Sequence, residues 1–418
     1  MTRWPYFLKE LHKNLQRLVS LVNCVAKAPK VRPITAERLA AAYASGMQKT
    51  QPVLESDADR VLAYISERAL VRKYADKGPA TMDGIRNRIT RGEPFLEAQD
   101  WFLSDPQLPS STGGEREQSF ARTVRACQEL GLLNDRTLTI SSYGDCLVRI
   151  AELSGVLQAP GGNGRNPFVP EASYSMAAYF QILRCDFVFQ RELLGRIPVS
   201  QVSFSDLAIQ AEELLIAVER AIGVTAANRA DREWLAKRLK SARELRERVR
   251  KDKDQGSGHV SIQTLYRNFE DILLPRLEFL TDVAALRKPQ PGRYVYERGD
   301  GYAWLAELTR RGSDGITSGY FSAFAKIYNR DVRPLVEPSE VIAHLEQAFD
   351  LFKSMSGYAP IVECAMFANA AAWKSDPWSY VEVSACQEAL RQSALQNPPR
   401  AHIVSDRFRR PETFRLAK

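Results

Sequence analysis

The stretch RLEFLTDVAALRKPQPGRYVYERGDGYAWL, residues 276–305, joins two helical patterns through a short β-type run. Leu277, Leu280 and Ala284 recur at helical spacing and should turn toward a core. After a basic break, an alternating run at 293–298 with two tyrosines precedes a glycine and the start of a second helix. The order helix, hairpin, helix predicts a small mixed module inside a mainly α protein with small β-hairpins.

The composition is that of a folded, mildly basic protein. The 418 residues are 44% apolar, which is enough for about two to four domains with cores of their own. Lys and Arg outnumber Asp and Glu by 58 to 50, so the formal charge is +8. This balance favours an anionic partner.

Cysteine and histidine form no metal-binding pattern. The six cysteines are widely spaced without a C-x-x-C pair, which argues against a zinc ribbon or a disulfide framework. The four histidines are isolated from one another, and no apolar run approaches the ~18 residues that span a membrane. We therefore expect a cytoplasmic protein with reduced thiols, no membrane contact, no metal and no cofactor.

Helical patterns and breaks divide the chain. Apolar residues at helical spacing predict helices over 6–25 and 57–74, and the run at 158–171 is typical of a linker. We expect five parts: an N-terminal helical region (1–56), a first module (57–157), a helical middle region (172–255), a second module (256–335) and a third module with a basic tail (336–418).

The last helix of the middle region carries a narrow apolar seam. Its members are spaced by 4, 3, 3 and 4 residues: Leu235, Leu239, Ala242, Leu245 and Val249. From Arg229 to Lys253, eleven Lys or Arg stand against five Asp or Glu. The helix is either a solvated helix that packs by one stripe or a helix whose arginines follow a phosphate backbone.

The opening pattern occurs three times. Residues 119–150 form a first copy, 276–305 the second, and 359–416 a third and less regular one. In the third copy, 378–395 should supply the helix and 397–416 the two strands with their turn.

This order resembles the winged helix-turn-helix superfamily. The residues that carry the resemblance are ELGLLNDRTLTISSYG at 129–144 and FLTDVAALRKPQPGRYVYERGDG at 279–301. The resemblance implies tandem winged helix-turn-helix modules joined by a helical scaffold. It also implies that the helix before each hairpin enters the major groove of DNA, while the hairpin lies on the DNA backbone.

An array of three such modules is similar to the DNA-recognition half of FokI-type restriction enzymes, without their nuclease domain. No Asp or Glu in the chain has a Lys two residues later, so the D/E-x-K half of the common nuclease core is absent. By analogy we expect a non-catalytic, double-stranded DNA-binding component of a bacterial restriction or anti-phage defence system. Its partners would be duplex DNA and effector subunits such as a nuclease or an ATPase.

In the first copy, helix periodicity places arginines away from the core. Phe120, Val124, Cys127 and Leu130 should be buried, which leaves two arginines on the other face and a third at the start of the hairpin. The predicted DNA contacts of this copy are Arg122, Arg125 and Arg136.

In the second copy, the outward helix face should carry Glu278, Thr281, Asp282 and Ala285, and its two carboxylates would repel a groove. The hairpin region still offers four basic groups for DNA: Arg287, Lys288, Arg293 and Arg298.

In the third copy, Val383, Cys386 and Leu390 should face the core, with Ser384, Gln387, Glu388 and Arg391 outside. Gln and Arg can read base edges, and the arginine-dense tail can contact phosphates. The predicted DNA contacts are Gln387, Arg391, Arg400, Arg407, Arg409 and Arg410, with Arg415 in the same tail.

Three other functions remain open. The modules would dock other proteins if the chain were a kleisin-like assembly subunit, and the same modules would suit a transcription regulator. An enzyme is a further possibility, because carboxylates distant in the sequence can converge in a fold. The sequence contains no nucleophile elbow, dinucleotide fingerprint or kinase loop, so it favours binding over catalysis.

Overall fold

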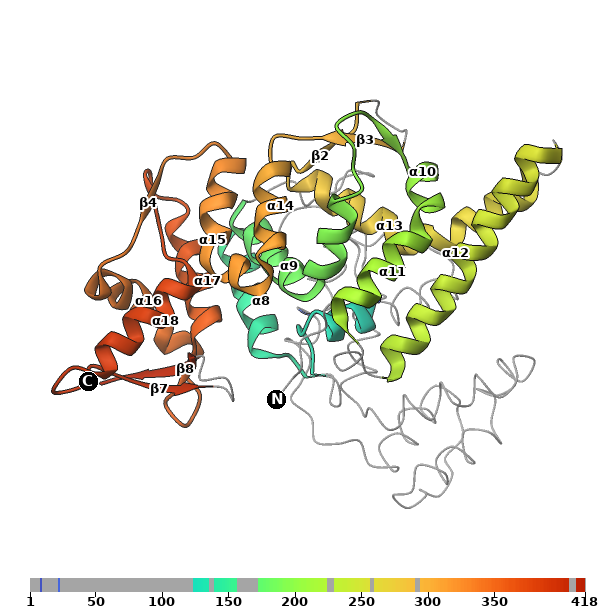
Figure 1. The fold of residues 1–418 in the computed structure, drawn as a ribbon. Helices are drawn as coiled ribbons and strands as arrows, with labels where there is room; N and C mark the ends of the chain where they lie inside the picture. The colour runs from blue at the N-terminus through green and yellow to red at the C-terminus, as the bar shows by residue number, and fades with distance from the viewer. Residues whose placement is uncertain are drawn as a thin grey trace, which may run out of the picture. The chain divides into compact units, whose positions relative to one another are not determined.

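The computed structural model describes residues 8–9, 22, 123–134, 139–155, 172–223, 229–255, 259–289, 294–405 and 411–417. The predicted helix at 57–74 and the linker at 158–171 lie outside these residues. The described chain is mainly helical with short strands, as predicted (Figure 1). No helix in these ranges is long and apolar enough to cross a membrane. The chain forms two compact units, Arg17–Asp145 and a larger one made of Met1–Gln16 with Cys146–Lys418.

The smaller unit contains the helix and hairpin of the first copy. Residues 123–129 are helical, and Val124, Cys127 and Leu130 are buried as predicted. Leu133 pairs with Ile140 in an antiparallel bridge, and helix α8 (Ser142–Leu153) begins directly afterwards.

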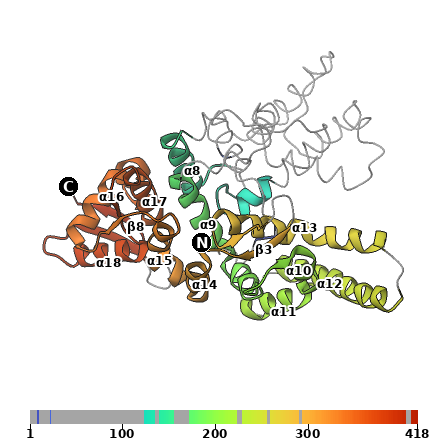
Figure 2. The same cartoon turned by 90° about the horizontal axis from the view of Figure 1, so that it is seen from above.

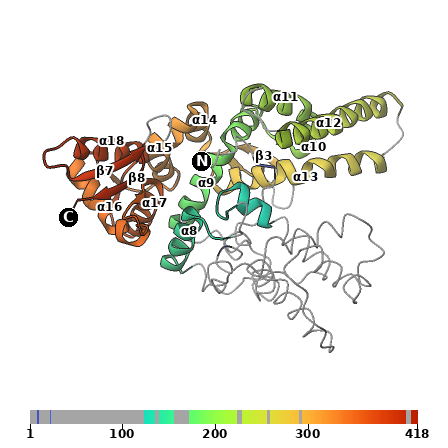
Figure 3. The ribbon, with the colours of Figure 1, turned by 90° about the horizontal axis from the view of Figure 1, so that it is seen from below.

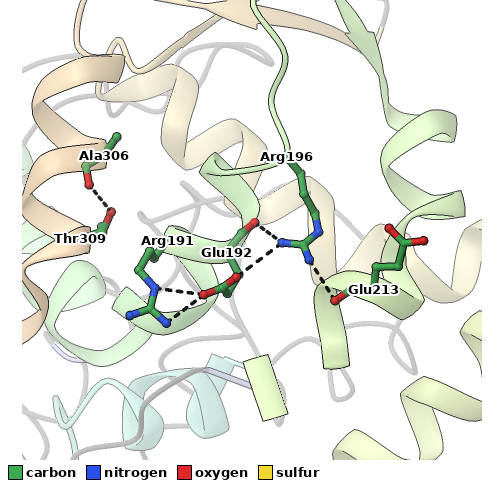
Figure 4. Close-up of polar contacts among 6 residues, drawn as sticks. All are labelled: Arg191, Glu192, Arg196, Glu213, Ala306 and Thr309. Carbon is green, nitrogen blue, oxygen red and sulfur yellow. Dashed lines mark hydrogen bonds and ion pairs between the residues drawn. The ribbon is translucent and has the colours of Figure 1, made fainter. Parts of the chain in front are cut away.

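The larger unit is built on a buried helix, α9 (Ala172–Leu194). It packs against α11 (Ala211–Ile222), α14 (Tyr302–Arg310), α15 (Gly312–Ile327) and α17 (Ile361–Ala372). At its end, Arg196 donates to the backbone oxygens of Glu192 (2.7 Å) and Glu213 (2.9 Å), as Figure 4 shows. This arginine joins the C-terminus of α9 to α11.

The first group of strands and helices contains the opening segment. It comprises β1 (Val202–Ser203), α10 (Phe204–Ile209), α12 (Arg229–Gln255), α13 (His259–Asp282), β2 (Leu286–Arg287) and β3 (Val295–Arg298). The strands form an antiparallel sheet in the order β1-β3-β2. The seam of α12 is buried at Leu235, Leu239, Ala242 and Leu245, as its spacing predicted.

The helix ends of the first and second copies share one backbone pattern. Gly131 (φ 67°) and Ala284 (φ 55°) both adopt the left-handed conformation. The next amide donates five residues back in each, from Leu132 to Cys127 and from Ala285 to Leu280, both at 2.8 Å. Such a cap turns the chain out of the helix and into the hairpin.

This cap explains one wrong prediction in the second copy. Ala285 was expected on the outward helix face, but it is fully buried. The helix ends before it, at Asp282, so helical periodicity no longer sets its direction.

The C-terminal group carries a second three-stranded sheet. It comprises α16 (Pro338–Phe352), β5 (Ala359–Pro360), α17, α18 (Val383–Ala394), β7 (Ala401–Ser405) and β8 (Pro411–Leu416). The antiparallel sheet has the order β5-β8-β7. Figures 2 and 3 show α16, α17 and α18 gathered beside this sheet.

The helix of the third copy begins later than predicted. Residues 378–380 were expected to be helical, but Trp378–Tyr380 form strand β6, which pairs in parallel with β4 (Val332–Pro334). The Trp378 side chain is fully buried and its Nε1 donates to the backbone oxygen of Asn369 at 3.0 Å. The strand therefore anchors the segment that leads into α18.

The N-terminal helix prediction is also corrected in part. Val22 is helical, but Leu8 and Lys9 are not. The Leu8 amide donates to Asp186 Oδ1 at 2.8 Å, and its oxygen accepts from Arg276 Nη2. The side chains of Asp186 and Arg276 thus form the hydrogen bonds with the backbone of Leu8 that a helix would otherwise have provided.

Candidate nucleic-acid interface

The β7–β8 hairpin has one packed face and one open face. Ile403 lies opposite Phe414, which is fully buried, and these residues point toward the helices of the C-terminal group. The next pair along, His402 opposite Arg415, is exposed. Directly opposed residues of an antiparallel pair share one face, so the open face carries a histidine beside an arginine.

One further basic group, Arg400, extends this open face. Arg400 is exposed just before β7, and its backbone oxygen accepts from the Ala417 amide at 2.9 Å. The guanidinium of Arg415 lies 5.4 Å from the centre of the Tyr358 ring, and this contact orients its long side chain. We call Arg400, His402 and Arg415 the hairpin basic face.

Helix α18 presents the face that its periodicity predicted. Val383, Cys386 and Leu390 are buried, whereas Gln387 and Arg391 are half-buried. Arg391 Nη1 lies 3.4 Å from Oε2 of the exposed Glu388. The face therefore combines an amide, an arginine and a carboxylate.

The N-terminal end of α18 is attached to α15. The carboxylate of Glu382 accepts from the backbone amides of Phe321 (3.3 Å) and Ser322 (2.9 Å). Burial raises the pKa of Glu382 to about 7, against the lowering effect of these donors. Val383 at the first turn is also buried, so this end of α18 is fixed to the fold.

In the second copy, the Lys288 side chain contacts other residues of the same module. Its Nζ lies 2.6 Å from Glu278 and 5.8 Å from the ring centres of both Tyr294 and Tyr296. The Tyr296 hydroxyl also donates to Glu278 at 3.2 Å. The carboxylate and the rings hold the ammonium group against the sheet.

Arg298 and Arg287 differ in their surroundings. The Arg298 guanidinium donates twice to the Ile197 oxygen, at 2.7 and 3.1 Å, and lies 4.2 Å from the centre of the Tyr302 ring. Arg287 is exposed, with Nε 3.5 Å from Glu297. Arg298 therefore joins parts of the fold, while Arg287 faces solvent.

The carboxylates of α13 are half-buried rather than fully outward. Glu278 pairs with Lys288, and Asp282 hydrogen-bonds with Tyr179. Burial and the nearby Glu278 raise the pKa of Asp282 to about 6. The expected repulsive pair is thus partly neutralised within the protein.

The structure describes only one of the remaining predicted contacts. Arg125 is exposed on the first-copy helix. Arg122, Arg136, Arg293, Arg407, Arg409 and Arg410 lie outside the described residues. Across the described ranges, no three His, Cys, Asp or Glu side chains lie close enough together to hold a metal ion.

The predictions from sequence missed the charged groups that are buried. Arg276 and Asp186 are fully buried and paired, and Glu382 was not singled out. Arg276 has one signal in the sequence: it stands on the same helix face as Leu273 and Leu280, where a charged residue requires a buried partner.

No protein-family model matches the chain, and neither a curated protein nor a solved structure is detectably similar to it.

Proposed function

We propose that the chain binds double-stranded DNA through winged helix-turn-helix modules. The C-terminal group supports this because α16, β5, α17, α18, β7 and β8 follow in that order, with the sheet order β5-β8-β7. In a winged helix, the third helix is also followed by a hairpin. This hairpin pairs with a short strand that comes between the first and second helices in the sequence.

The group around the opening segment has the same strand order. Its short strand β1 comes first, α13 precedes the hairpin, and the sheet order is β1-β3-β2. In this interpretation α9, α10 and α13 are the three helices, and α11 and α12 are an insertion before the third.

The hairpin basic face is the observation that carries the DNA proposal. A strand pair with one face in the core exposes Arg400, His402 and Arg415 together on the other. Arginines in this arrangement contact phosphates without regard to sequence.

Helix α18 contributes less to base recognition in this proposal. A recognition helix reads bases from its N-terminal residues, but that end of α18 is attached to α15 through Glu382. The exposed Glu388 would also lie against the phosphates. Contact between the hairpin and the phosphate backbone is therefore the main source of affinity, and Lys288 and Arg298 have structural roles.

Fluorescence anisotropy with a labelled duplex tests the proposal. Affinity should fall steeply between 50 and 200 mM salt, as expected when phosphate contacts release counterions, by about tenfold or more for two or three contacts. Arg400→Gln with Arg415→Gln should weaken binding to unrelated sequences alike. The matched control is Arg310→Gln with Arg311→Gln, which removes the same charge from two exposed arginines at the end of α14. An absence of binding at low salt would refute the proposal.

The biological setting that we propose is a bacterial restriction or anti-phage system, in which separate subunits supply the chemistry. A phage-plating assay with the Arg400→Gln, Arg415→Gln variant tests this setting. If the variant protects against phage as well as the unmodified chain does, the hairpin basic face has no role in such a system.

A second candidate function is protein docking in a larger assembly. Exposed apolar side chains in the C-terminal group favour it, because Leu395 is 87% exposed and Met355 is fully exposed. Co-purification with a partner that depends on Leu395, together with no DNA affinity, would favour this function over the first.

A further inference from the structure

Helix α12 exposes far more positive than negative charge. Between residues 232 and 251, eight exposed side chains are basic and three are acidic. The basic ones are Arg232, Lys237, Lys240, Arg243, Arg246, Arg248, Arg250 and Lys251. Figures 2 and 3 show α12 running beside α13 as a pair that extends away from the sheet of its own group. Helix α12 therefore offers a long, positively charged surface.

Four of these arginines fall on one side of the helix. At 3.6 residues per turn, Arg232, Arg243, Arg246 and Arg250 lie within an arc of about 60° that overlaps the edge of the buried seam at Leu239. From the first to the last they span about 27 Å, which matches about eight base pairs of duplex. We call these four residues the α12 arginine stripe.

The carboxylate of one side chain, Glu212, already pairs with the stripe. Glu212 of α11 accepts from Arg243 Nε at 3.0 Å and from Arg246 Nη1 at 3.3 Å. These arginines lower the pKa of Glu212, chiefly through the hydrogen bond from Arg243. The carboxylate shows that two neighbouring guanidinium groups of the stripe can hold one anion between them.

The ends of the stripe remain open. Within the described ranges, Arg232 and Arg250 are exposed and have no ion-pair or hydrogen-bond partner. With Glu212 and Glu213 counted against the four arginines, a net charge of about +2 is left on this side.

The position of α12 in the chain also favours contact with DNA. It stands between α10 and α13, the helices that in the proposed winged-helix module precede the hairpin. In helix-turn-helix proteins this connection lies close to the DNA, because the second of these helices enters the groove and the first crosses the backbone. In the proposed module, a positively charged insertion between these two helices extends the contact with DNA.

We propose that the α12 arginine stripe is a second contact for duplex DNA, which binds along its phosphate backbone independently of base sequence. The inference rests on the proposed function, because the winged-helix interpretation sets the side of the module that faces DNA. It adds a contact separate from the hairpin basic face.

The test measures how duplex affinity of the full chain depends on salt. Arg232→Gln with Arg250→Gln should reduce the slope of log K against log salt by about 1.8, the amount expected for two phosphate contacts. The matched control, Lys237→Gln with Arg248→Gln, removes the same charge from the opposite side of α12 and should leave most of the slope in place. Because Arg232 and Arg250 have no partners within the described ranges, circular dichroism melting should be unchanged in this variant.

A third variant tests the role of the Glu212 carboxylate, which pairs with two arginines of the stripe. Glu212→Gln removes the internal competitor and should strengthen duplex binding at low salt. If it weakens binding instead, the stripe serves the packing of α11 and the inference fails.

The outcomes distinguish the two proposals. If the unmodified chain does not bind duplex, the proposed function fails. If the hairpin variant Arg400→Gln, Arg415→Gln lowers the slope and the stripe variant does not, only this inference fails. If the stripe variant loses binding to vesicles with anionic lipid while its duplex slope is unchanged, the stripe contacts a lipid surface and the inference is overturned.

Discussion

Arg276 of α13 and Asp186 of α9 form a two-point ion pair in which neither side chain is exposed. Nε and Nη2 of the arginine lie 2.8 Å from Oδ2 and Oδ1 of the aspartate. The pair also binds the backbone of Leu8, and the guanidinium lies 3.8 Å from the centre of the Phe189 ring. One buried pair thus joins the N-terminal segment to two helices of the larger unit.

Removing one member of this pair should be strongly destabilising. Asp186→Asn leaves a buried guanidinium without its counter-charge, which costs about 3–5 kcal/mol. The double variant Asp186→Leu, Arg276→Met replaces the pair by apolar side chains and should lose less than the single variant. Urea denaturation measures both. A single variant within about 1 kcal/mol of the parent would show that the pair is not essential to the fold.

The two left-handed helix caps predict opposite effects of two reverse substitutions, alanine to glycine at one cap and glycine to alanine at the other. Ala284→Gly should stabilise the protein, because a left-handed conformation costs a residue with a Cβ about 1–2 kcal/mol, more than the ~0.5–1 kcal/mol entropic cost of glycine. Gly131→Ala should destabilise the protein for the same reason.

Thermal denaturation of the two single variants and their double variant checks this prediction. The two positions have equivalent backbone hydrogen bonds, so each serves as a control for the other. A rise in melting temperature for both substitutions would mean that the cap conformation is not what limits stability.

Helical spacing predicted the buried faces of the helix at 123–129 and of α18, and the order of helix before hairpin in the second and third copies, because both depend on local pattern. Buried Val124, Cys127 and Leu130, and buried Val383, Cys386 and Leu390, follow directly from helical spacing. The strand β6 was missed because its partner β4 lies more than forty residues earlier, and a pattern read along the chain does not show such pairing.

The candidate site was less predictable than the fold. Lys288 and Arg298 look like open basic groups in the sequence, but Glu278 and the Ile197 oxygen engage them. Only the fold brings residue 197 next to residue 298. The α12 seam, by contrast, could be read from spacing, and the exposed arginines beside it follow from the same period.

Gly299 is predicted to resist substitution. A Cβ at this position would lie 2.4 Å from the backbone oxygen of Ala284, a contact that only a shift of the hairpin or of the cap can relieve. Gly299→Ala should therefore cost about 1–3 kcal/mol in urea denaturation. At Gly195 the nearest atom to an added Cβ is 3.5 Å away, so Gly195→Ala is the control. Equal effects of the two substitutions would contradict the close approach at Gly299.

Glu382 should make the protein less stable as the pH rises toward neutrality. Its pKa is about 7 in the folded chain and near the ordinary 4.5 when unfolded. The folded state therefore keeps a proton that the unfolded state has released, and this contribution to stability is complete below pH 4.5 and lost as the pH rises through 7. Asp282, with a pKa of about 6, acts in the same direction but over a window that ends lower.

Glu382→Gln separates these two groups. An amide is neutral at every pH, so the variant should keep the decline due to Asp282 up to about pH 6 and show a flatter profile from there to pH 8. Urea midpoints at pH 5, 6, 7 and 8 measure the profile, with Glu388→Gln on the exposed side of α18 as the control. If the decline between pH 6 and 8 persists in Glu382→Gln, a different group causes it, and the attachment of α18 to α15 does not depend on the charge of Glu382.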